Sequence, residues 1–320
     1  MRSRAFLAPM SGVTDLPFRR LAHRFGAGLV VSEMVACDEA LLASEESRLR
    51  TEGEGLDLHV VQLAGRDPEA MRAGVKVAEA AGADIIDINM GCPAKRVVNG
   101  YAGSALMRES DLAIRVVAAT VDAASVPVTL KMRLGWDHES LNAADIARRA
   151  EAVGIQLVAV HGRTRCQFYG GAADWRAIRA IKECVSIPVV ANGDLIRAKD
   201  APAMLAASGA DAVMIGRGAY GQPWIVGQTD ALLARRRVPE APEGEALRDI
   251  VLEHFEAILS HYGTGKGVRI ARKHLGWYLD RLSTTVPAAL RGVLMQSVDP
   301  ALVRRLLVSA FDISAEAAAA

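Results

Sequence analysis

The residue with the clearest chemical potential is a cysteine placed between a glycine and a proline. Cys92 lies in the segment INMGCPAKRVVNGYAGSALM, residues 88–107, at the end of an apolar run. A thiol there can donate a proton or attack an electrophile, and its neighbours set its pKa. Lys95 and Arg96 follow closely enough to attract an anionic substrate. A small buried cysteine at a turn is the simpler alternative, and it is the better interpretation for the other cysteines, at positions 37, 166 and 184.

Four polar side chains of other types stand at or near the ends of apolar runs. They are Gln62, Asn89, Lys131 and His161. A cation at Lys131 suits a bound anion or an electron-rich ring that gains negative charge, and Gln62 offers amide groups to the edge of a heterocycle. A structural ion pair at Lys131 and a satisfied core histidine at His161 are the alternatives. Polar side chains of these four types at the ends of four different runs are not expected in a sheet whose only role is structural.

Two glycine turns late in the chain indicate a phosphate site. They are the sequences Asn192-Gly193-Asp194 and Gly216-Arg217-Gly218. Glycine lets backbone N–H groups approach an anion closely, and the planar guanidinium of Arg217 can grip it. Two tight turns beside a surface arginine are the alternative. One phosphate grip together with ammonium, imidazole and amide groups suggests a nucleotide-like cofactor. Flavin mononucleotide (FMN) fits best, because no second, dinucleotide motif is present.

These residues share one place only if the apolar runs are strands of a single sheet. Eight runs recur, each followed by a helical pattern, over residues 5–10, 29–34, 58–65, 84–91, 127–135, 157–162, 188–194 and 211–218. Their nearly continuous apolar character is typical of parallel strands covered by helices. Eight units of ~30 residues predict a (β/α)8 TIM barrel, whose active site lies at the carboxyl ends of the strands. A doubly wound open sheet competes, but the first turn, in AFLAPMSGVTD, lacks the GxGxxG pattern.

A polar segment after the last run divides the chain. Residues 235–246 hold two prolines and predict a linker, and residues 247 to about 311 show only helical periodicity. We therefore expect a barrel domain over residues 1–238 and a small all-helical domain over residues 239–320. In the second domain Arg269, Arg272 and Lys273 have the spacing of one helix face. Such a basic stripe suits contacts with phosphates, and a solvated helix face is the alternative.

Composition excludes several classes of protein. Hydrophobic residues make up 51% and charged residues 23% of the 320, which is ordinary for a globular chain and excludes a disordered or collagen-like one. A net charge of +1 excludes a uniformly basic coat for nucleic acid. The four cysteines form no metal-ligand spacing, so we expect no metal site. The chain shows no signal-peptide core and no apolar run near the ~18 residues of a membrane span, so we expect a cytoplasmic protein with no membrane contact.

Seven segments together resemble one known family. They are APMSGVTD, VQLAG, DINMGCPAKRVVNGYAGSALM, TLKMRLGWD, VHGRTRCQFYGGAADW, VVANGD and IGRGAYGQPW. From about residue 5 to residue 282 the chain is similar to the tRNA-dihydrouridine synthases, and it most resembles their bacterial B-type branch. The resemblance implies an FMN-containing barrel that reduces the C5–C6 bond of particular uridines in tRNA with NADPH. We expect a monomer, since one protein can hold one tRNA.

The resemblance also implies roles for residues at matching positions. It makes Cys92 the proton donor to C5 while the flavin delivers hydride to C6, and Asn89 a residue that holds the target base. It implies contacts with the flavin ring region for Pro9, Met10, Ser11, Gln62, Lys131 and His161. It implies contacts with the ribityl chain and phosphate for Asn192, Gly193, Asp194, Gly216 and Arg217. It places Arg163 and Arg165 near the tRNA, whereas Ser11 departs from the alanine that the family often has.

Two other functions stay open on the sequence. A flavin barrel acting on a free pyrimidine, of the dihydroorotate-dehydrogenase type, would need no basic helix, because its substrate is small. A non-enzymatic RNA-binding protein on a barrel scaffold would bind no flavin. Incubation with free uridine and with unmodified tRNA separates the two enzymes, and flavin absorbance separates both from the binding protein.

Overall fold

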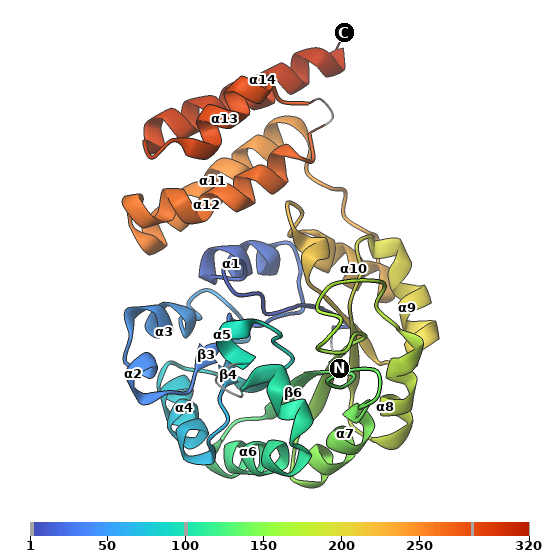
Figure 1. The fold of residues 1–320 in the computed structure, drawn as a ribbon. Helices are drawn as coiled ribbons and strands as arrows, with labels where there is room; N and C mark the ends of the chain where they lie inside the picture. The colour runs from blue at the N-terminus through green and yellow to red at the C-terminus, as the bar shows by residue number, and fades with distance from the viewer. Residues whose placement is uncertain (1–2, 99–101, 283–284, 320) are drawn as a thin grey trace. The chain divides into compact units, whose positions relative to one another are not determined.

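The computed structural model describes residues 3–98, 102–282 and 285–319, and its central feature is a sheet of nine parallel strands (Figure 1). The strands are β1 (Ala5–Leu7), β2 (Leu29–Val30), β3 (Val35–Ala36), β4 (Val60–Ala64), β5 (Ile85–Met90), β6 (Val128–Arg133), β7 (Leu157–His161), β8 (Val189–Asn192) and β9 (Ala212–Ile215). Their order in the sheet is β2-β1-β9-β8-β7-β6-β5-β4-β3. The two edge strands, β2 and β3, are separated in sequence only by residues 31–34.

The two edges of the sheet meet, which closes it into a barrel. Val31 forms a parallel bridge with Val60 of β4, and the amide of Ser32 donates to the carbonyl of Val60 at 3.0 Å. Because β2 pairs with β1 and β3 pairs with β4, residues 29–36 act as one strand of an eight-stranded barrel. The predicted (β/α)8 barrel is therefore confirmed, and the predicted run at residues 29–34 is two short strands.

Apolar side chains from strands around the barrel form a common core. They are Phe6, Ala8, Val31, Val60, Ala159, Val190, Ala212 and Met214. Burial of such side chains stabilises the fold by roughly 1.5–3 kcal/mol for each large one.

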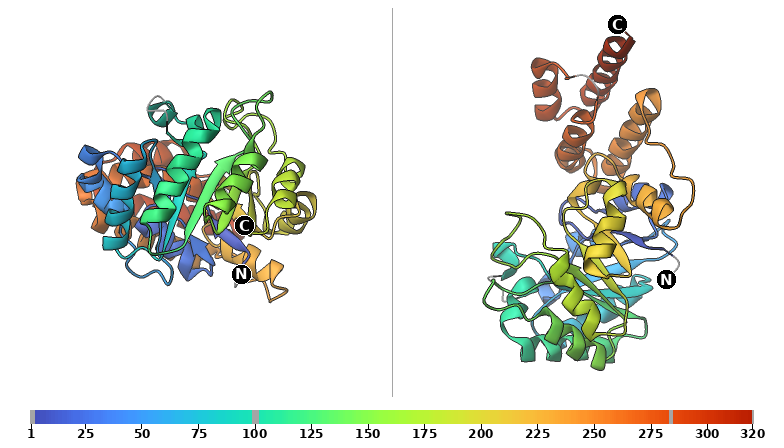
Figure 2. Two further views of the ribbon diagram at one scale, coloured as in Figure 1. Left: turned by 90° about the horizontal axis from the view of Figure 1, so that it is seen from below. Right: turned by 90° about the vertical axis from the view of Figure 1, so that its right-hand side faces the viewer.

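Helices follow the strands and surround the barrel (Figure 2). They are α1 (Leu16–Arg24), α2 (Glu39–Leu42), α3 (Glu45–Arg50), α4 (Pro68–Ala80), α5 (Lys95–Val98), α6 (Ser110–Ala123), α7 (Ala143–Ala152), α8 (Arg179–Cys184), α9 (Ala201–Ser208) and α10 (Ile225–Leu233). In α4 the side chain of Asp67 accepts from the amide of Ala70, and Met71, Val75 and Ala78 are buried, as their spacing predicts. Short 3-10 helices include η1 (Gly103–Arg108) and η4 (Arg217–Ala219).

The chain divides into two compact units. One comprises Met1–Gly218 and Ile225–Val238, and the other comprises Ala219–Trp224 and Pro239–Ala320. Residues 219–224 thus belong to the second unit, although the residues before and after them in the sequence belong to the barrel unit. Within the second unit the rings of Tyr220 and Trp277 stack, with centroids 3.8 Å apart. That stacking is a tertiary contact, which the order of segments along the chain does not predict.

The second unit is helical, with a buried aromatic and histidine core. Its helices are α11 (Gly244–Tyr262), α12 (Thr264–Leu279), α13 (Ala288–Gln296) and α14 (Pro300–Ala319). His254 of α11 is hydrogen-bonded to the hydroxyl of the fully buried Tyr278 at 3.1 Å, and its ring meets that of His274 edge-on. Burial lowers the pKa of His254 to about 3 and the pKa of His274 well below 6.5, so both are neutral at pH 7. None of the described helices is long and apolar enough to span a bilayer.

Candidate active site

The strand register brings the predicted strand-end side chains to one edge of the barrel. Asn89 of β5 is paired with Lys131 of β6, and His161 of β7 is paired with Asn192 of β8. Arg133, two residues beyond Lys131, is paired with His161. Because all the strands are parallel, these residues meet at the carboxyl ends, where TIM-barrel enzymes have their active sites.

A chain of hydrogen bonds holds the backbone at Cys92. Oδ1 of Asn89 accepts from the amide of Cys92 at 2.9 Å and from the amide of Gly91 at 3.1 Å. Nδ2 of Asn89 donates to Oε1 of Gln62 at 2.7 Å. Nε2 of Gln62 donates in turn to the buried carboxylate of Asp87 at 2.6 Å. The carboxylate therefore sets the orientation of both carboxamides, and the second carboxamide sets the position of the cysteine backbone.

Burial keeps the Cys92 thiol protonated at neutral pH. It raises the pKa of the thiol above its usual 9.0, although a hydrogen bond from the amide of Ala94 and the charges of Arg133 and Lys131 act in the opposite direction. Burial also raises the pKa of Asp87, against the hydrogen bonds from Thr129 and Gln62 and the charge of Lys131. A protonated thiol can serve as an acid, and the two nearby cations stabilise the thiolate that remains after proton transfer.

Arg133, which our sequence analysis did not assign to the site, connects the loops after β5 and β7. Its side chain is 1% exposed, and its guanidinium donates at 2.8 Å to the carbonyls of Gly91, Thr164 and Phe168. Burial lowers its pKa to about 10, so it keeps its charge. The sequence does contain a signal for this residue, because Arg133 is the last residue of the apolar strand TLKMR. Arginine is rarely buried unless its charge is paired or hydrogen-bonded, so its place in this strand indicates such a role.

Lys131 is held from the neighbouring strands. Its ammonium donates to Oδ1 of Asn192 at 3.2 Å, while Nδ2 of Asn192 donates to the carbonyl of Met214 at 2.8 Å. Burial and the charge of Arg133 lower the pKa of Lys131 to about 8, and Asp87 opposes that shift. Among the described residues the hydrogen-bond partner of this ammonium is therefore a neutral amide, so the ammonium can also act on a bound ligand.

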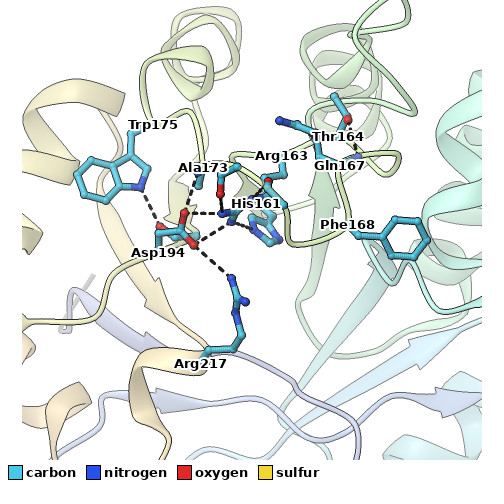
Figure 3. A network of polar contacts seen from close by, with 12 residues as sticks. His161, Arg163, Thr164, Gln167, Phe168, Ala173, Trp175, Asp194 and Arg217 are labelled. Carbon is cyan, nitrogen blue, oxygen red and sulfur yellow. Dashed lines mark hydrogen bonds and ion pairs between the residues drawn. The ribbon is translucent and has the colours of Figure 1, made fainter.

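An ion-pair network joins the loops after β7, β8 and β9 (Figure 3). The carboxylate of Asp194 accepts from Arg163 at 2.6 Å and from Arg217 at 3.3 Å. Arg163 also donates to the carbonyls of Gly170 and Gly171. Burial acts to raise the pKa of Asp194, but the hydrogen bonds from Arg163 and the amide of Ala173 outweigh it and the pKa is lowered. Arg163, which the resemblance places near the tRNA, is buried in this structure and acts on the protein's own loops.

His161 is a neutral imidazole with a defined tautomer. Its Nε2 lies 3.3 Å from Nη1 of Arg163 (Figure 3). Because a guanidinium only donates, Nε2 accepts and the ring proton is on Nδ1. Burial and the charges of Lys131, Arg133, Arg163 and Arg217 lower the pKa of His161 to about 2. The ring therefore offers one fixed N–H donor over the physiological range.

The two predicted glycine turns leave backbone donors available. Gly193 and Asp194 have positive φ values of 122° and 55°, and a Cβ at Gly193 would lie 2.9 Å from the ring of His161. Asp194 is thus a rare non-glycine residue in the left-handed region, held there by its ion pairs. No hydrogen bond between the described residues uses the backbone N–H of Gly193, Asp194 or Gly216. Such donors in adjacent loops are suited to an anion.

The loop at residues 9–11 forms a pinned turn at the end of β1. The amide of Met10 donates to the hydroxyl of Thr14 at 2.8 Å, and the amides of Val13 and Thr14 return bonds to the carbonyl of Met10. The amide of Gly12 donates to the buried carboxylate of Glu33, which lies in the segment between β2 and β3. Pro9 and Met10 are half-buried, whereas Ser11 is exposed.

The remaining predicted residues have varied surroundings. Arg165 lies beside aromatic rings of the barrel unit, and the side chains of Lys95 and Arg96 lie outside the part of the chain that the structure describes. Arg269 of α12 is exposed, and Arg272 donates to the carbonyls of Gln296 and Ser297 at 2.8 and 3.1 Å. Lys273 is half-buried. The stripe is therefore only partly exposed, because Arg272 caps the end of α13.

No group of three or more His, Cys, Asp or Glu side chains suited to a metal ion occurs among residues 3–98, 102–282 and 285–319.

Comparison with known proteins identifies the family. The family model described as "Dihydrouridine synthase (Dus)" matches residues 6–315. A "Probable tRNA-dihydrouridine synthase" of Rhizobium leguminosarum bv. phaseoli is 54% identical over 315 residues, which cover 98% of this chain and 97% of that protein. A "tRNA-dihydrouridine synthase B" of Pseudomonas putida is 50% identical over 280 residues, which cover 87% of this chain and 83% of that protein.

Solved structures agree on the fold. The histamine dehydrogenase from Rhizobium sp. 4-9 aligns with a TM-score of 0.56 at 14% identity, over 97% of this chain and 62% of that one. An identity this low shows a shared architecture alone. The family model, by contrast, spans residues 6–315, which include both the Cys92 segment and the helices of the second unit, and the Rhizobium relative covers 98% of this chain. The chain therefore belongs to the dihydrouridine synthase family, with B-type members among its relatives.

Proposed function

We propose that this protein reduces the C5–C6 double bond of specific uridines in tRNA to 5,6-dihydrouridine, with bound FMN as cofactor and NADPH as reductant. The names of the relatives support the substrate and the product. The observation that carries the proposal is the protonated Cys92 thiol, whose backbone Asn89 holds at the end of a buried relay. A substrate of this kind implies action in the cytoplasm, and a monomer suffices to bind one tRNA.

The residues at the strand ends fit a flavin mononucleotide. The free N–H groups of Gly193, Asp194 and Gly216, with the exposed Arg217, suit its single phosphate. Asn192 lies between these turns and Lys131. Lys131, the Nδ1–H of His161 and Gln62 suit the ring, along which residues 9–11 would lie. Asp194 would not touch the phosphate directly, because its carboxylate is engaged with Arg163 and Arg217 and holds Arg217 in place.

When bound, FMN supplies the hydride that C6 of the uracil receives, and the protein supplies the proton. The Cys92 thiol donates its proton to C5 as the C5–C6 double bond is lost, so that the ring gains H⁺ and H⁻ in one reduction. The sulfur is left as a thiolate beside Arg133 and Lys131, both of which favour that charge. A proton from solvent then restores the thiol. Lys131 would also stabilise negative charge on the reduced cofactor.

The two predicted domains then have separate roles. The predicted barrel domain, residues 1–238, would hold the flavin and the extruded target uridine, since a stacked base cannot reach the strand ends. The helical residues 239–320 would bind the body of the tRNA. Arg269 and Lys273 are the members of the predicted stripe suited to phosphate contacts, whereas Arg272 supports them through α13. In the barrel unit Arg165, and Lys95 and Arg96 by their place in the sequence, would add contacts close to the site.

The decisive experiment compares substrates and one variant. Purified protein reconstituted with FMN is incubated with NADPH and either unmodified tRNA or free uridine, and dihydrouridine is measured in each. We expect product from tRNA only. We expect Cys92→Ala to bind FMN and to lose dihydrouridine formation. Turnover of free uridine alone would refute the tRNA substrate, and full activity of Cys92→Ala would refute the proton donor.

A further inference from the structure

Four side chains of the barrel unit form an arginine–aromatic cluster, made of Arg108, Trp136, Arg165 and Phe168. The guanidinium carbon of Arg108 lies 4.9 Å from the centroid of the Trp136 ring. The guanidinium carbon of Arg165 lies 4.6 Å from the centroid of the Trp136 ring and 4.6 Å from that of the Phe168 ring. Each distance is within the range of a cation–π interaction. The two aromatic rings thus hold one arginine in common.

The cluster is built from three loops on the same edge of the barrel as Cys92. Arg108 ends η1, which follows β5 and the Cys92 segment, while Trp136 follows β6. Arg165 and Phe168 follow β7. Backbone hydrogen bonds join the loop after β6 to the loop after β7. The amide of Arg165 donates to the carbonyl of Gly135 at 2.9 Å, and the amide of Cys166 donates to the carbonyl of Trp136 at 2.8 Å. The cluster therefore has a fixed backbone frame.

The protein does not neutralise the two positive charges of the cluster. Among the described residues, no carboxylate lies within ion-pair distance of Arg108 or Arg165. The Nε of Arg165 is buried and has no hydrogen-bond partner in that part of the chain. Asp137, next to Trp136, turns back to its own loop and accepts from the amide of Ser140 at 3.0 Å. Two arginines held by rings and left without anions are prepared for an external one.

Phe168 combines a strained backbone conformation with a partly exposed side chain. Phe168 has a φ of 49°, a conformation that L residues with bulky side chains rarely adopt. Arg133 holds the carbonyl of Phe168 at 2.8 Å, and the amide of Phe168 donates to the carbonyl of Arg165 at 3.0 Å. Phe168 is 36% exposed. Strain that the surroundings maintain is characteristic of ligand clamps, so the exposed ring has a use beyond packing.

We propose that the arginine–aromatic cluster binds the RNA strand next to the target nucleotide, with Arg108 and Arg165 on phosphates and Phe168 stacked on a base. The inference rests on the proposed function, in which the substrate is tRNA. A single RNA strand offers both anions and flat rings at short spacing, which matches two cations beside an exposed aromatic ring. Because the cluster lies on the same edge of the barrel as Cys92, these contacts would fall on the RNA near the extruded base.

The test measures tRNA binding by the full chain with bound FMN over a series of salt concentrations. Arg108→Gln and Arg165→Gln remove one charge each, and Phe168→Asn removes the ring while keeping a residue that tolerates positive φ. Arg115→Gln on α6 is the matched control, because Arg115 is exposed on a helix outside the barrel. Flavin content is measured for every variant, and affinities are compared per flavin-loaded protein.

We expect each arginine variant to lower the slope of log K against log salt by about 1. We expect Phe168→Asn to weaken binding about tenfold with the slope unchanged. Affinities and slopes equal to those of Arg115→Gln would overturn the proposal. Because Arg108 is exposed at the edge of the cluster, its variant decides the question even if Arg165→Gln loses flavin. If the wild-type protein fails to bind or reduce tRNA, the proposed function fails; if it succeeds and the cluster variants match the control, only this inference fails.

Discussion

Oδ1 of Asn89 lies 2.9 Å from the amide nitrogen of Cys92 and accepts its hydrogen bond. The other end of the same carboxamide donates to Gln62, which Asp87 orients from the barrel interior. A side chain at the end of one strand thereby fixes the loop that presents the thiol. The resemblance assigns Asn89 to the target base, and the geometry adds that Asn89 positions the acid.

Replacing Asn89 is expected to slow proton transfer more than it weakens tRNA binding. Asn89→Ala frees the amides of Gly91 and Cys92, and a displacement of about 1 Å at a reacting group can cost roughly 10²-fold in rate. Asn89→Asp keeps the acceptor for the two amides but loses the donor to Gln62, so we expect an intermediate rate. The rate of flavin reoxidation by tRNA in a single turnover is compared with the Kd for tRNA. A rise in Kd equal to the fall in rate would mean that Asn89 acts only through the base.

The sequence predicted the strand ends well because their pattern is local. Lys131 and His161 close apolar runs, and parallel strands bring such ends together whatever the rest of the chain does. The pairing of Arg163 with Asp194, 31 residues later, depends on which loops meet, and no spacing along the chain encodes that. For the same reason the sequence could not show that Arg133 reaches the carbonyl of Phe168.

The local pattern could not distinguish between two possible roles of one residue type. An arginine in HGRTR fits a phosphate contact as well as a buried ion pair, and the structure gives Arg163 the second. In the predicted basic stripe, Arg269 is exposed, while Arg272 bonds to carbonyls at the end of α13. Helical periodicity describes the helix alone, so it cannot show which members of a face another helix covers.

The reduction of the flavin by NADPH is expected to slow as the pH rises through about 8. Burial and the charge of Arg133 lower the pKa of Lys131 to about 8, so its charge is present below that pH and lost above it. If Lys131 stabilises the reduced flavin, stopped-flow reduction rates will fall with a midpoint near that pKa. Lys131→Met should be slow at neutral pH and show no such fall. A wild-type midpoint near 10.5 would contradict the lowered pKa.

Asp194→Asn is expected to lower the free energy of unfolding by about 3 kcal/mol at pH 7, because it leaves the buried guanidinium of Arg163 without its anion. The pKa of Asp194 is lowered in the folded state, so its stabilising effect is present above the unfolded-state pKa and is lost as the pH falls through the folded-state pKa. Urea titrations of both proteins at several pH values will therefore converge in acid.

Asp200→Asn provides the control for that comparison. Asp200 pairs with Arg197 at 2.8 Å in a pair whose arginine is two-thirds exposed. Surface pairs of this kind contribute at most about 1 kcal/mol. An equal loss of stability in Asp194→Asn and Asp200→Asn would show that the ion pairs of Asp194 stabilise the fold no more than a surface pair does.

The two buried histidines of the helical unit are expected to make the protein less stable as the pH falls below about 6.5. Burial keeps His254 and His274 neutral in the folded state, and the charge of Lys273 adds to the effect at His274. In the unfolded chain both bind protons near pH 6.5. The unfolded state therefore gains protons first, and each histidine removes about 1.4 kcal/mol of stability per pH unit until the pH nears its folded-state pKa.

Urea unfolding of the full chain at pH 7, 6 and 5 measures this slope. His274→Leu should reduce it by about 1.4 kcal/mol per pH unit, since one of the two protonation events is gone. Leu247→Ala, at a buried position of α11 without a titratable group, should lower stability by an amount that does not change with pH. If His274→Leu keeps the wild-type dependence of stability on pH, His274 is not a neutral buried group in the folded protein. The buried histidine pair would then be ruled out as the source of the acid sensitivity.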